Sequence, residues 1–334
     1  MSDVAFALLH PAEPPSGTVQ SLAGSRIAVL VPCYNEERTV AAVVAGFRAA
    51  LPMAEIYVYD NNSRDHTVDA AREAGAVVRS ETLQGKGNVV RRMFADIDAD
   101  VYVMVDGDNT YHAPSAPRLI EKLLTERLDM VVGARVDTEQ AAYRPGHRLG
   151  NRLLTGFVAH LFGERFKDIL SGYRVFSRRF VKSFPALAKG FETETELTVH
   201  ALELRMPVAE LPTPYGARPV GSVSKLNTYA DGWRILMVIL RLFREERPLQ
   251  FFSYCFGALF LLSVVLGTPI VIEYLATGLV PRLPTAVLST GIMLLAFLSL
   301  ACGLILDTVT RGRRELRRLA YLAIPATGAP ERPR

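Results

Sequence analysis

The chain has 334 residues, 49% of them hydrophobic and 22% charged, with a formal net charge of +4. Its 24 glycines and 20 prolines follow no period, so the composition excludes a collagen-like repeat and disorder over most of the length. Residues 311–334 carry seven arginines and two glutamates, so the rest of the chain is nearly neutral, which argues against a nucleic-acid-binding protein.

Residues 1–25 are predicted to be a flexible leader without the pattern of a signal peptide. From residue 26 to 134, short β-like runs alternate with helical patterns. We expect strands at 26–32, 55–60, 76–79, 101–106 and 130–134, and helices at 37–50, 67–74, 87–96 and 116–126. This alternation is typical of an α/β fold, a mostly parallel sheet with helices on both faces, which binds ligands at the carboxyl ends of its strands.

The alternating pattern weakens after Gly150. Helices are predicted at 151–162 and 195–205, and a loop rich in proline, glycine and serine at 211–225. Residues 229–247 have apolar side chains at a helical spacing, which fits either an amphipathic juxtamembrane helix or an ordinary packing helix. We therefore expect one large domain over 26–228 and an amphipathic helix at 229–247.

Two charge-free apolar runs follow, at 248–272 and 283–306. At ~1.5 Å per residue each is longer than the ~30 Å hydrocarbon core of a bilayer, so we predict a transmembrane hairpin; two buried core helices are the alternative. Arginines flank both outer ends of the hairpin, and the loop inside it is neutral. By the positive-inside rule, the large domain, both termini and the basic tail at 307–334 are cytoplasmic parts of a multi-pass protein of the cell membrane.

Two acids, Asp106 and Asp108, stand at the end of the predicted strand at 101–106, with Gly107 between them. Carboxylates held one residue apart at a strand end suit a hard divalent cation, Mg²⁺ or Mn²⁺, which bridges phosphate groups. The same segment resembles the first motif of haloacid dehalogenase-type phosphatases, in which the first aspartate is the nucleophile. Asp106 and Asp108 are therefore predicted to be metal ligands, with a nucleophilic Asp106 as the alternative.

Three further motifs precede the two acids. VPCYNEE (31–37) ends the first predicted strand, DNNSRD (60–65) ends the second, and GKGN (85–88) opens a predicted helix. Together with the acids, and in this order, they resemble the family 2 glycosyltransferases of GT-A fold over residues 26–225. Phosphatases of the haloacid dehalogenase class have no reason to carry the three upstream motifs.

The resemblance implies a nucleotide-sugar site in these loops. It implies that Asp60 contacts the base, although Asn-Asn-Ser at 61–63 stands where many members have Asp-Gly-Ser. Lys86 is matched to a phosphate or base-edge contact beside a helix N-terminus, with a solvent-exposed lysine as the alternative. The residues that the resemblance implies in nucleotide-sugar binding are Pro32, Tyr34, Glu36, Asp60, Lys86 and Asp106.

Two more segments, DILSGYR (168–174) and RPVGSVSKL (218–226), resemble the polyprenyl-phosphate (dolichol-phosphate-type) hexosyltransferase branch. In that branch, basic residues gather around an acceptor phosphate, and arginine suits this role because it grips phosphate oxygens in a fork. Structural salt bridges are the alternative for each residue. The positions matched to the acceptor phosphate are Arg135, Arg148, Arg218, Ser224 and Lys225, and those matched near the sugar or acceptor are Asp168, Ser171, Glu192 and Glu194.

The resemblance implies inverting transfer of a hexose from a nucleotide-sugar, of GDP-mannose or UDP-glucose type, to a polyprenyl phosphate at the cytoplasmic membrane face. A phosphate monoester has a second pKa of ~6, so this acceptor is mostly dianionic at neutral pH and needs no general base. The catalytic residues implied are Asp106, Asp108, Arg135 and Lys225.

Three other functions stay open at the level of the sequence. A same-fold transferase acting on the hydroxyl of a lipid or lipid-linked sugar would need a base, for which Glu192 and Glu194 are candidates. A phosphatase and a catalytically silent membrane scaffold are the others. The sequence identifies neither the sugar nor the nucleotide, and it leaves a homo-oligomer open.

Overall fold

The computed structural model describes residues 25–137, 156–157, 166, 168–186, 193–216, 237 and 240–326. The chain divides into two units, one made of Met1–Gly232 with Arg317–Arg334 and the other of Trp233–Leu316. The predicted leader, except residue 25, and most of the predicted helix at 151–162 and loop at 211–225 lie outside the described residues.

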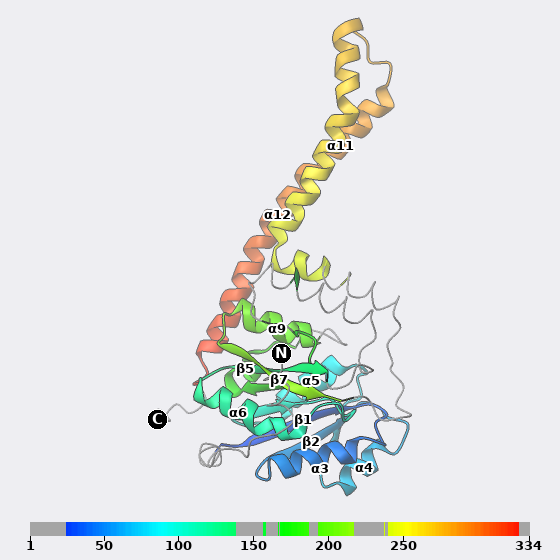
Figure 1. Ribbon diagram of the computed structural model, residues 1–334. Helices are drawn as coiled ribbons and strands as arrows, with labels where there is room; N and C mark the ends of the chain where they lie inside the picture. The colour runs from blue at the N-terminus through cyan, green and yellow to red at the C-terminus, as the bar shows by residue number, and fades with distance from the viewer. Residues whose placement is uncertain are drawn as a thin grey trace. The chain divides into compact units, whose positions relative to one another are not determined.

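The first unit is built on a seven-stranded sheet in the order β3-β2-β1-β4-β6-β5-β7. Strands β1, β2, β5 and β7 are labelled in Figure 1. Neighbouring strands are parallel, except that β6 runs antiparallel to both β4 and β5. The prediction of a mostly parallel sheet is confirmed. The strands are β1 (Ile27–Cys33), β2 (Glu55–Asp60), β3 (Val77–Ser80), β4 (Val101–Met104), β5 (Met130–Asp137), β6 (Arg174–Ser177) and β7 (Val208–Tyr215).

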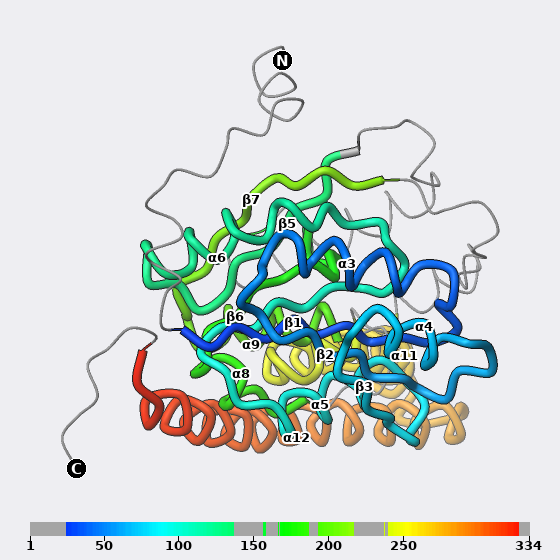
Figure 2. The backbone as a smooth tube through the Cα atoms, turned by 90° about the horizontal axis from the view of Figure 1, so that it is seen from below, coloured from blue at the N-terminus to red at the C-terminus, as the bar shows by residue number. Residues whose placement is uncertain are grey.

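Helices cover both faces of this sheet (Figure 2). On one face α3 packs against α4 and α6, and on the other α5 packs against α8 and α9. Helical spacing of apolar residues explains the packing: α6, for example, buries Leu119, Ile120 and Leu123 on one side. The helices are α3 (Val40–Ala50), α4 (Thr67–Glu73), α5 (Lys86–Asp96), α6 (Ala116–Thr125), α8 (Arg178–Ser183) and α9 (Thr193–Glu203), with a 3-10 turn η1 (Ala113–Ser115).

The central strands β1 and β4 supply the middle of the core. All four side chains of β4 are buried, as are six of the seven of β1. Strands covered on both faces are apolar throughout rather than alternating, which is why these runs are readable in the sequence. The loops that follow β1, β2 and β4 therefore start from the most rigid part of the unit.

Part of the first unit differs from the prediction. Residues 211–215, predicted as loop, belong to β7, which pairs in parallel with β5 along its whole length. Pro212 and Pro214 mimic a loop composition, but an edge strand tolerates proline because only one of its sides is hydrogen-bonded. β6 and α8 are absent from the prediction because β6 (RVFS) begins with a buried arginine and half of the residues of α8 (RRFVKS) are basic, so neither has the pattern of an apolar run.

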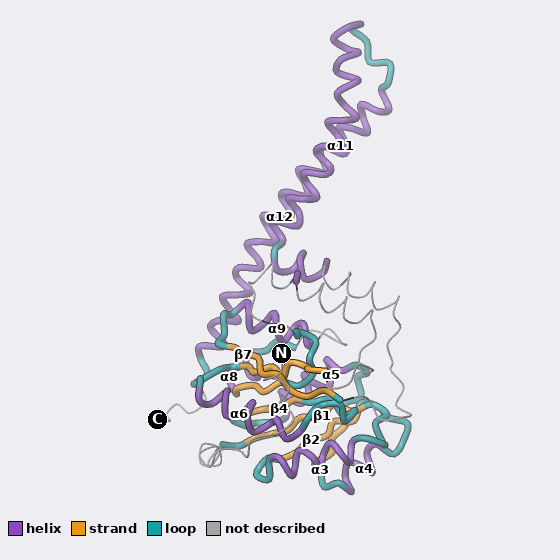
Figure 3. The backbone as a smooth tube through the Cα atoms, in the orientation of Figure 1, coloured by secondary structure: helices purple, strands orange, loops and turns teal. Residues whose placement is uncertain are grey.

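The second unit contains α11 (Pro248–Thr277) and most of α12 (Leu283–Leu322), joined by a short loop (Figure 3). Both helices are long and apolar enough to cross a membrane, with mean hydropathies of 2.4 and 2.3 over an 18-residue window, of which 11% is buried. Core helices of a soluble protein would be mostly buried, so the exposed apolar surface supports the predicted membrane hairpin.

Small residues let the two long helices pack closely. A Cβ atom added at Gly303 would lie 2.9 Å from the Cβ of Phe252, and the Ser263 hydroxyl donates to the Ser289 carbonyl at 2.7 Å. Contacts of this kind are the usual means of helix association in a bilayer.

Helix α12 is longer than predicted. The segment predicted as a basic tail from residue 307 is helical as far as Leu322, and pairs such as Asp307 with Arg311, at 2.7 Å, support it one turn apart. The residues from Arg317 onward belong to the first unit. Of the predicted helix at 229–247, the described residues 237 and 240–246 are helical.

His200 on α9 is a buried titratable group that affects the stability of the first unit. Its ring packs against the stacked rings of Phe180 and Phe184, and its centroid lies 5.4 Å from the centroid of each. Burial lowers the pKa of His200 to about 3, and the Arg317 guanidinium acts in the same direction. Because an unfolded histidine titrates near ~6.5, the unfolded chain binds a proton between these values that the folded chain does not.

We predict that the first unit loses stability as the pH falls below ~6.5, by up to about 1.4 kcal/mol per pH unit from this residue alone. Unfolding of the full chain in detergent at pH 7.5 and 5.5 measures this effect. His200→Phe, which cannot be protonated, should reduce the difference between the two pH values, whereas His66→Asn at an exposed site should not. An unchanged pH dependence in His200→Phe would contradict the assignment.

Candidate active site

An asparagine with a positive φ turns the chain after each of the strands β1, β2 and β4. These residues are Asn35 (φ 53°), Asn62 (φ 64°) and Asn109 (φ 55°). Asparagine tolerates the left-handed region better than most residues, so it permits a tight turn at the strand end. The three loops that the sequence singles out thus begin at the same edge of the sheet.

Hydrogen bonds join the loop after β1 to the loop after β2. The Asn35 amide donates to the Ser63 hydroxyl at 2.9 Å, and the Glu36 amide donates to the Thr67 hydroxyl at 2.8 Å. Asp60, 6% exposed at the end of β2, accepts from the Ser63 amide at 3.2 Å. The predicted nucleotide-binding residues on these two loops are therefore held together.

Asn61 fixes the loop that leads into α5. Its side-chain amide donates to the carbonyls of Glu81 and Leu83, both at 2.8 Å, and its side-chain oxygen accepts from the Gly85 amide at 2.7 Å. The side chain is buried, so these bonds replace water. The sequence analysis gave Asn61 no role. The one feature that could have pointed to it is that Asn61 stands where many family members have an aspartate.

Lys86, the first residue of α5, reaches two carboxylates that are distant in sequence. Its ammonium contacts Asp106 after β4 and Glu194 at the start of α9, and we call these three residues the acid–lysine cluster. The Lys86 and Glu194 side chains are only 13% and 7% exposed. Burial alone would lower the pKa of Lys86, but the two carboxylates outweigh burial and raise it, so the side chain stays charged.

The two predicted metal ligands differ in exposure. The Asp106 side chain is 30% exposed, whereas Asp108 is buried and accepts from the Thr110 hydroxyl at 2.6 Å. Strand β4 ends at Met104, two residues earlier than predicted, so both acids lie on the loop.

Gly107, between the acids, occupies a position that only glycine fits. A Cβ atom there would lie 2.6 Å from the Cys33 sulfur, while the Gly107 carbonyl accepts from the Thr39 hydroxyl at 2.7 Å. Burial, then the charges of nearby carboxylates, raise the pKa of the Cys33 thiol, so it is neutral. The carboxylates that act on this thiol are Glu36, Asp60, Asp106 and Asp108.

The carboxylates of Asp106 and Asp108 have the donor chemistry that Mg²⁺ and Mn²⁺ prefer. In the described part of the chain, no group of three or more histidine, cysteine, aspartate or glutamate side chains is arranged to hold a metal. A divalent cation at these two carboxylates would need further oxygen ligands, which the diphosphate of a nucleotide can supply. The residues therefore fit a cation that binds together with its nucleotide.

The segment 168–174 lies directly beside Asp106. A Cβ atom added at Gly172 would collide with the Asp106 carboxylate, and the Gly172 amide donates to the Tyr111 hydroxyl at 2.8 Å. The Ser171 side chain is fully buried and donates to the Gly133 carbonyl at 2.6 Å. Ser171 thus anchors the segment, and Gly172 lets its backbone approach Asp106.

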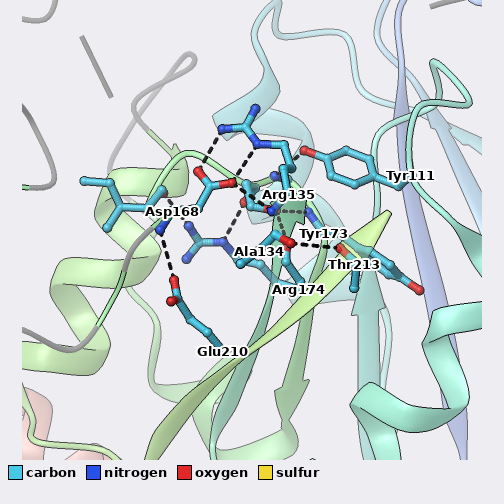
Figure 4. Close-up of polar contacts among 12 residues, drawn as sticks. Tyr111, Ala134, Arg135, Asp168, Tyr173, Arg174, Glu210 and Thr213 are labelled. Carbon is cyan, nitrogen blue, oxygen red and sulfur yellow. Dashed lines mark hydrogen bonds and ion pairs between the residues drawn. The ribbon is translucent and has the colours of Figure 1, made fainter. Parts of the chain in front are cut away.

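Arg135 on β5 forms a two-pronged ion pair with Asp168 (Figure 4). The guanidinium donates to the two carboxylate oxygens at 2.7 and 2.8 Å and lies 5.5 Å from the centre of the Tyr215 ring. The Asp168 amide donates to the Glu210 carboxylate at 3.0 Å. Arg135, predicted to bind the acceptor phosphate, is therefore held by an acid that was also predicted at the site.

Arg174 is a fully buried residue to which sequence reasoning gave no role (Figure 4). It donates to the carbonyls of Ser171 at 2.9 Å and Ile169 at 2.5 Å and to the Thr198 hydroxyl at 2.8 Å. Burial lowers its pKa to about 10, against the opposing effect of Glu194. The charged side chain ties the segment before β6 to α9.

Of the other predicted site residues, Pro32 belongs to β1 and Tyr34 to the loop after it. Five lie outside the described residues: Arg148, Glu192, Arg218, Ser224 and Lys225.

Comparison with known proteins gives matches that include most of the described part of the first unit. Residues 28–184 match the family described as Glycosyl transferase family 2. Glycosyltransferase AglJ of Haloferax volcanii is 36% identical over 229 residues, which cover 68% of this chain and 75% of that protein. A dolichyl-phosphate hexose transferase of the same organism is 30% identical over 223 residues, covering 66% of this chain and 95% of that protein.

Solved structures share the fold. Glucosyl-3-phosphoglycerate synthase from Mycobacterium tuberculosis, in complex with phosphoglyceric acid, matches with a TM-score of 0.57 and 26% identity, covering 70% of this chain and 85% of that one. Another complex of that enzyme, at 25% identity and the same TM-score, contains Mn²⁺, uridine-diphosphate and glucosyl-3-phosphoglycerate.

We predict that Gly107→Ala destabilises the first unit by about 1–3 kcal/mol, because the new methyl group displaces the Cys33 sulfur or the loop of the acids. Denaturant unfolding of the full chain measures the loss. In a Cys33→Ala background, which removes the sulfur, the same substitution should cost less than ~0.5 kcal/mol. Equal costs in the two backgrounds would show that the contact does not constrain the loop.

Proposed function

Since the chain belongs to glycosyl transferase family 2, we propose that it transfers a hexose from a nucleotide-sugar to a polyprenyl phosphate, with inversion at the anomeric carbon. The observation that carries the proposal is the contact of Gly172 with Asp106, because it joins the segment matched to acceptor binding to the acids matched to donor binding. Two observations support a lipid acceptor: this chain is similar to a dolichyl-phosphate hexose transferase, and it contains two helices that are apolar enough to cross a membrane.

The donor would bind in the loops after β1 and β2. We propose a donor of GDP-mannose or UDP-glucose type, with its nucleoside held by Pro32, Tyr34, Glu36 and Asp60. Lys86 is proposed to lie beside the diphosphate. A divalent cation, Mg²⁺ or Mn²⁺, held by Asp106 and Asp108 would neutralise charge on the departing nucleoside diphosphate. Structures of the similar synthase with Mn²⁺ or Mg²⁺ and uridine-diphosphate support this assignment.

The acceptor phosphate would bind on the other side of Asp106. Arg135 lies nearby on β5, and Arg148, Arg218, Ser224 and Lys225 are proposed to complete the phosphate site. An acceptor phosphate oxygen attacks the anomeric carbon, the bond to the nucleoside diphosphate breaks, and its electron pair leaves with that group. No proton has to move, because the phosphate is already ionised at neutral pH. The chain's residues need only hold two anions in line.

Transfer to a hydroxyl group is the second candidate. The similar solved enzyme is named a glucosyl-3-phosphoglycerate synthase, and phosphoglyceric acid carries a hydroxyl group that can accept a sugar. That reaction needs a general base, and Glu194 is the described candidate. Its carboxylate contacts the Lys86 ammonium, so it would have to give up this ion pair before accepting a proton. The geometry therefore favours the phosphate acceptor, which requires no base.

The proposal also concerns location. The two apolar helices support association with a membrane. We propose that they span the cell membrane with the first unit on the cytoplasmic side, because arginines flank both outer ends of the hairpin and such residues are enriched on the cytoplasmic side.

We predict that the purified full chain, given a labelled nucleotide-sugar and a polyprenyl phosphate, forms a lipid product that mild acid hydrolyses. Asp108→Asn should lower the rate by on the order of 100-fold or more, and a chelator should abolish turnover until Mg²⁺ or Mn²⁺ is restored. Asp98→Asn, at an exposed acid that pairs with Arg26, serves as the matched control. No product with any GDP- or UDP-hexose, or full activity in Asp108→Asn, would contradict the proposal.

A further inference from the structure

Two buried acids of the first unit form hydrogen bonds with the last turns of α12. The Arg317 guanidinium donates to the Glu203 carboxylate at 2.5 Å, and the Tyr321 hydroxyl donates to the Asp129 carboxylate at 2.8 Å. The Glu203 and Asp129 side chains are 3% and 0% exposed. We call these four residues the C-terminal clasp. All of them belong to the first unit.

The clasp is more than a surface contact. Asp129 also accepts from the Ser177 hydroxyl and from Arg179, both at 2.7 Å, and the Arg179 guanidinium lies 4.8 Å above the Tyr321 ring. Exposed ion pairs contribute little, but removal of one partner from a buried pair leaves a charge without solvation. The end of α12 is therefore an integral part of the unit that contains the sheet.

Helix α9 connects the clasp to the acid–lysine cluster. Glu203 is the last residue of α9 and Glu194 is the second, which puts them about 14 Å apart along the helix at ~1.5 Å per residue. Nine of the eleven residues of α9 are buried, so the helix is packed along its length. A displacement at Glu203 is then transmitted to Glu194, because a packed helix moves as one body.

We propose that Arg317 is a positioning residue for the transfer reaction: through Glu203 and α9 it holds Glu194 against Lys86, and Lys86 in turn against Asp106. The inference rests on the proposed function. Arg317 lies near the end of α12 (Leu283–Leu322), so the last turns of this helix, which belong to the first unit, then set the geometry of the donor site.

A double-mutant cycle on the full chain in detergent tests this path. Arg317→Ala should lower kcat about tenfold in the wild-type background and less than twofold in a Glu194→Gln background, where the cluster is already broken. Arg317→Lys should recover part of the loss. Arg318→Ala, at the exposed neighbouring position, should leave kcat unchanged.

Amide hydrogen exchange gives a readout that does not depend on turnover. In Arg317→Ala, the amides of residues 193–203 should exchange faster than in the wild type, while those of α3 should not change. If Arg317→Ala does not fold, Arg317→Gln, which removes the charge that Glu203 pairs with but keeps most of the side chain, carries the same cycle with an expected loss of about threefold.

The outcomes separate the two proposals. A wild-type chain that forms no product overturns the proposed function. A wild-type chain that forms product while Arg317→Ala loses activity by the same factor in both backgrounds, or loses none, overturns the positioning role of Arg317 alone.

Discussion

The site depends on one interaction, the placement of the Lys86 ammonium between two carboxylates. A lysine at the first residue of a helix would ordinarily remain in water, and here its side chain is 13% exposed. The loss of hydration is offset only because Asp106 and Glu194 both contact it. The pair of contacts fixes the start of α5, the loop after β4 and the start of α9 relative to one another.

The charge balance of this edge supports the proposal that a divalent cation binds together with the donor. Burial and four acids act together on the Cys33 thiol, which shows how closely these carboxylates gather: Glu36, Asp60, Asp106 and Asp108. Lys86 offsets part of that charge, and Glu194 adds to it. A nucleoside diphosphate approaching such an edge is repelled unless positive charge arrives with it. The proposed divalent cation, bound by two carboxylates and the diphosphate, meets this requirement.

The sequence predicted those strands and helices whose apolar pattern is visible within the element itself. The strand at 55–60 has the predicted bounds, because a run of apolar and aromatic residues that ends in an acid marks both the strand and the start of the loop after it. The loops after β1, β2 and β4 lie at one edge of the sheet, as the predicted strand–helix alternation implies, since parallel strands bring their carboxyl ends together. The predicted loop at 211–215 was wrong because the prolines of β7 are tolerated by its position at the sheet edge, which only the finished topology reveals. The partners of Lys86 and Arg317 were equally hidden: Glu194 is 108 residues from Lys86, and Glu203 is 114 residues from Arg317.

Equilibrium binding of nucleoside diphosphate to the full chain tests the role of Lys86 most directly. Titration calorimetry with UDP and GDP in the presence of Mn²⁺ would compare the wild type with Lys86→Met, and Lys122→Met at a surface ion pair would serve as control. The account predicts at least tenfold weaker binding of the better nucleotide to Lys86→Met, because Asp106 and Glu194 then lack their ammonium and repel the diphosphate. Unchanged or tighter binding in Lys86→Met would contradict it.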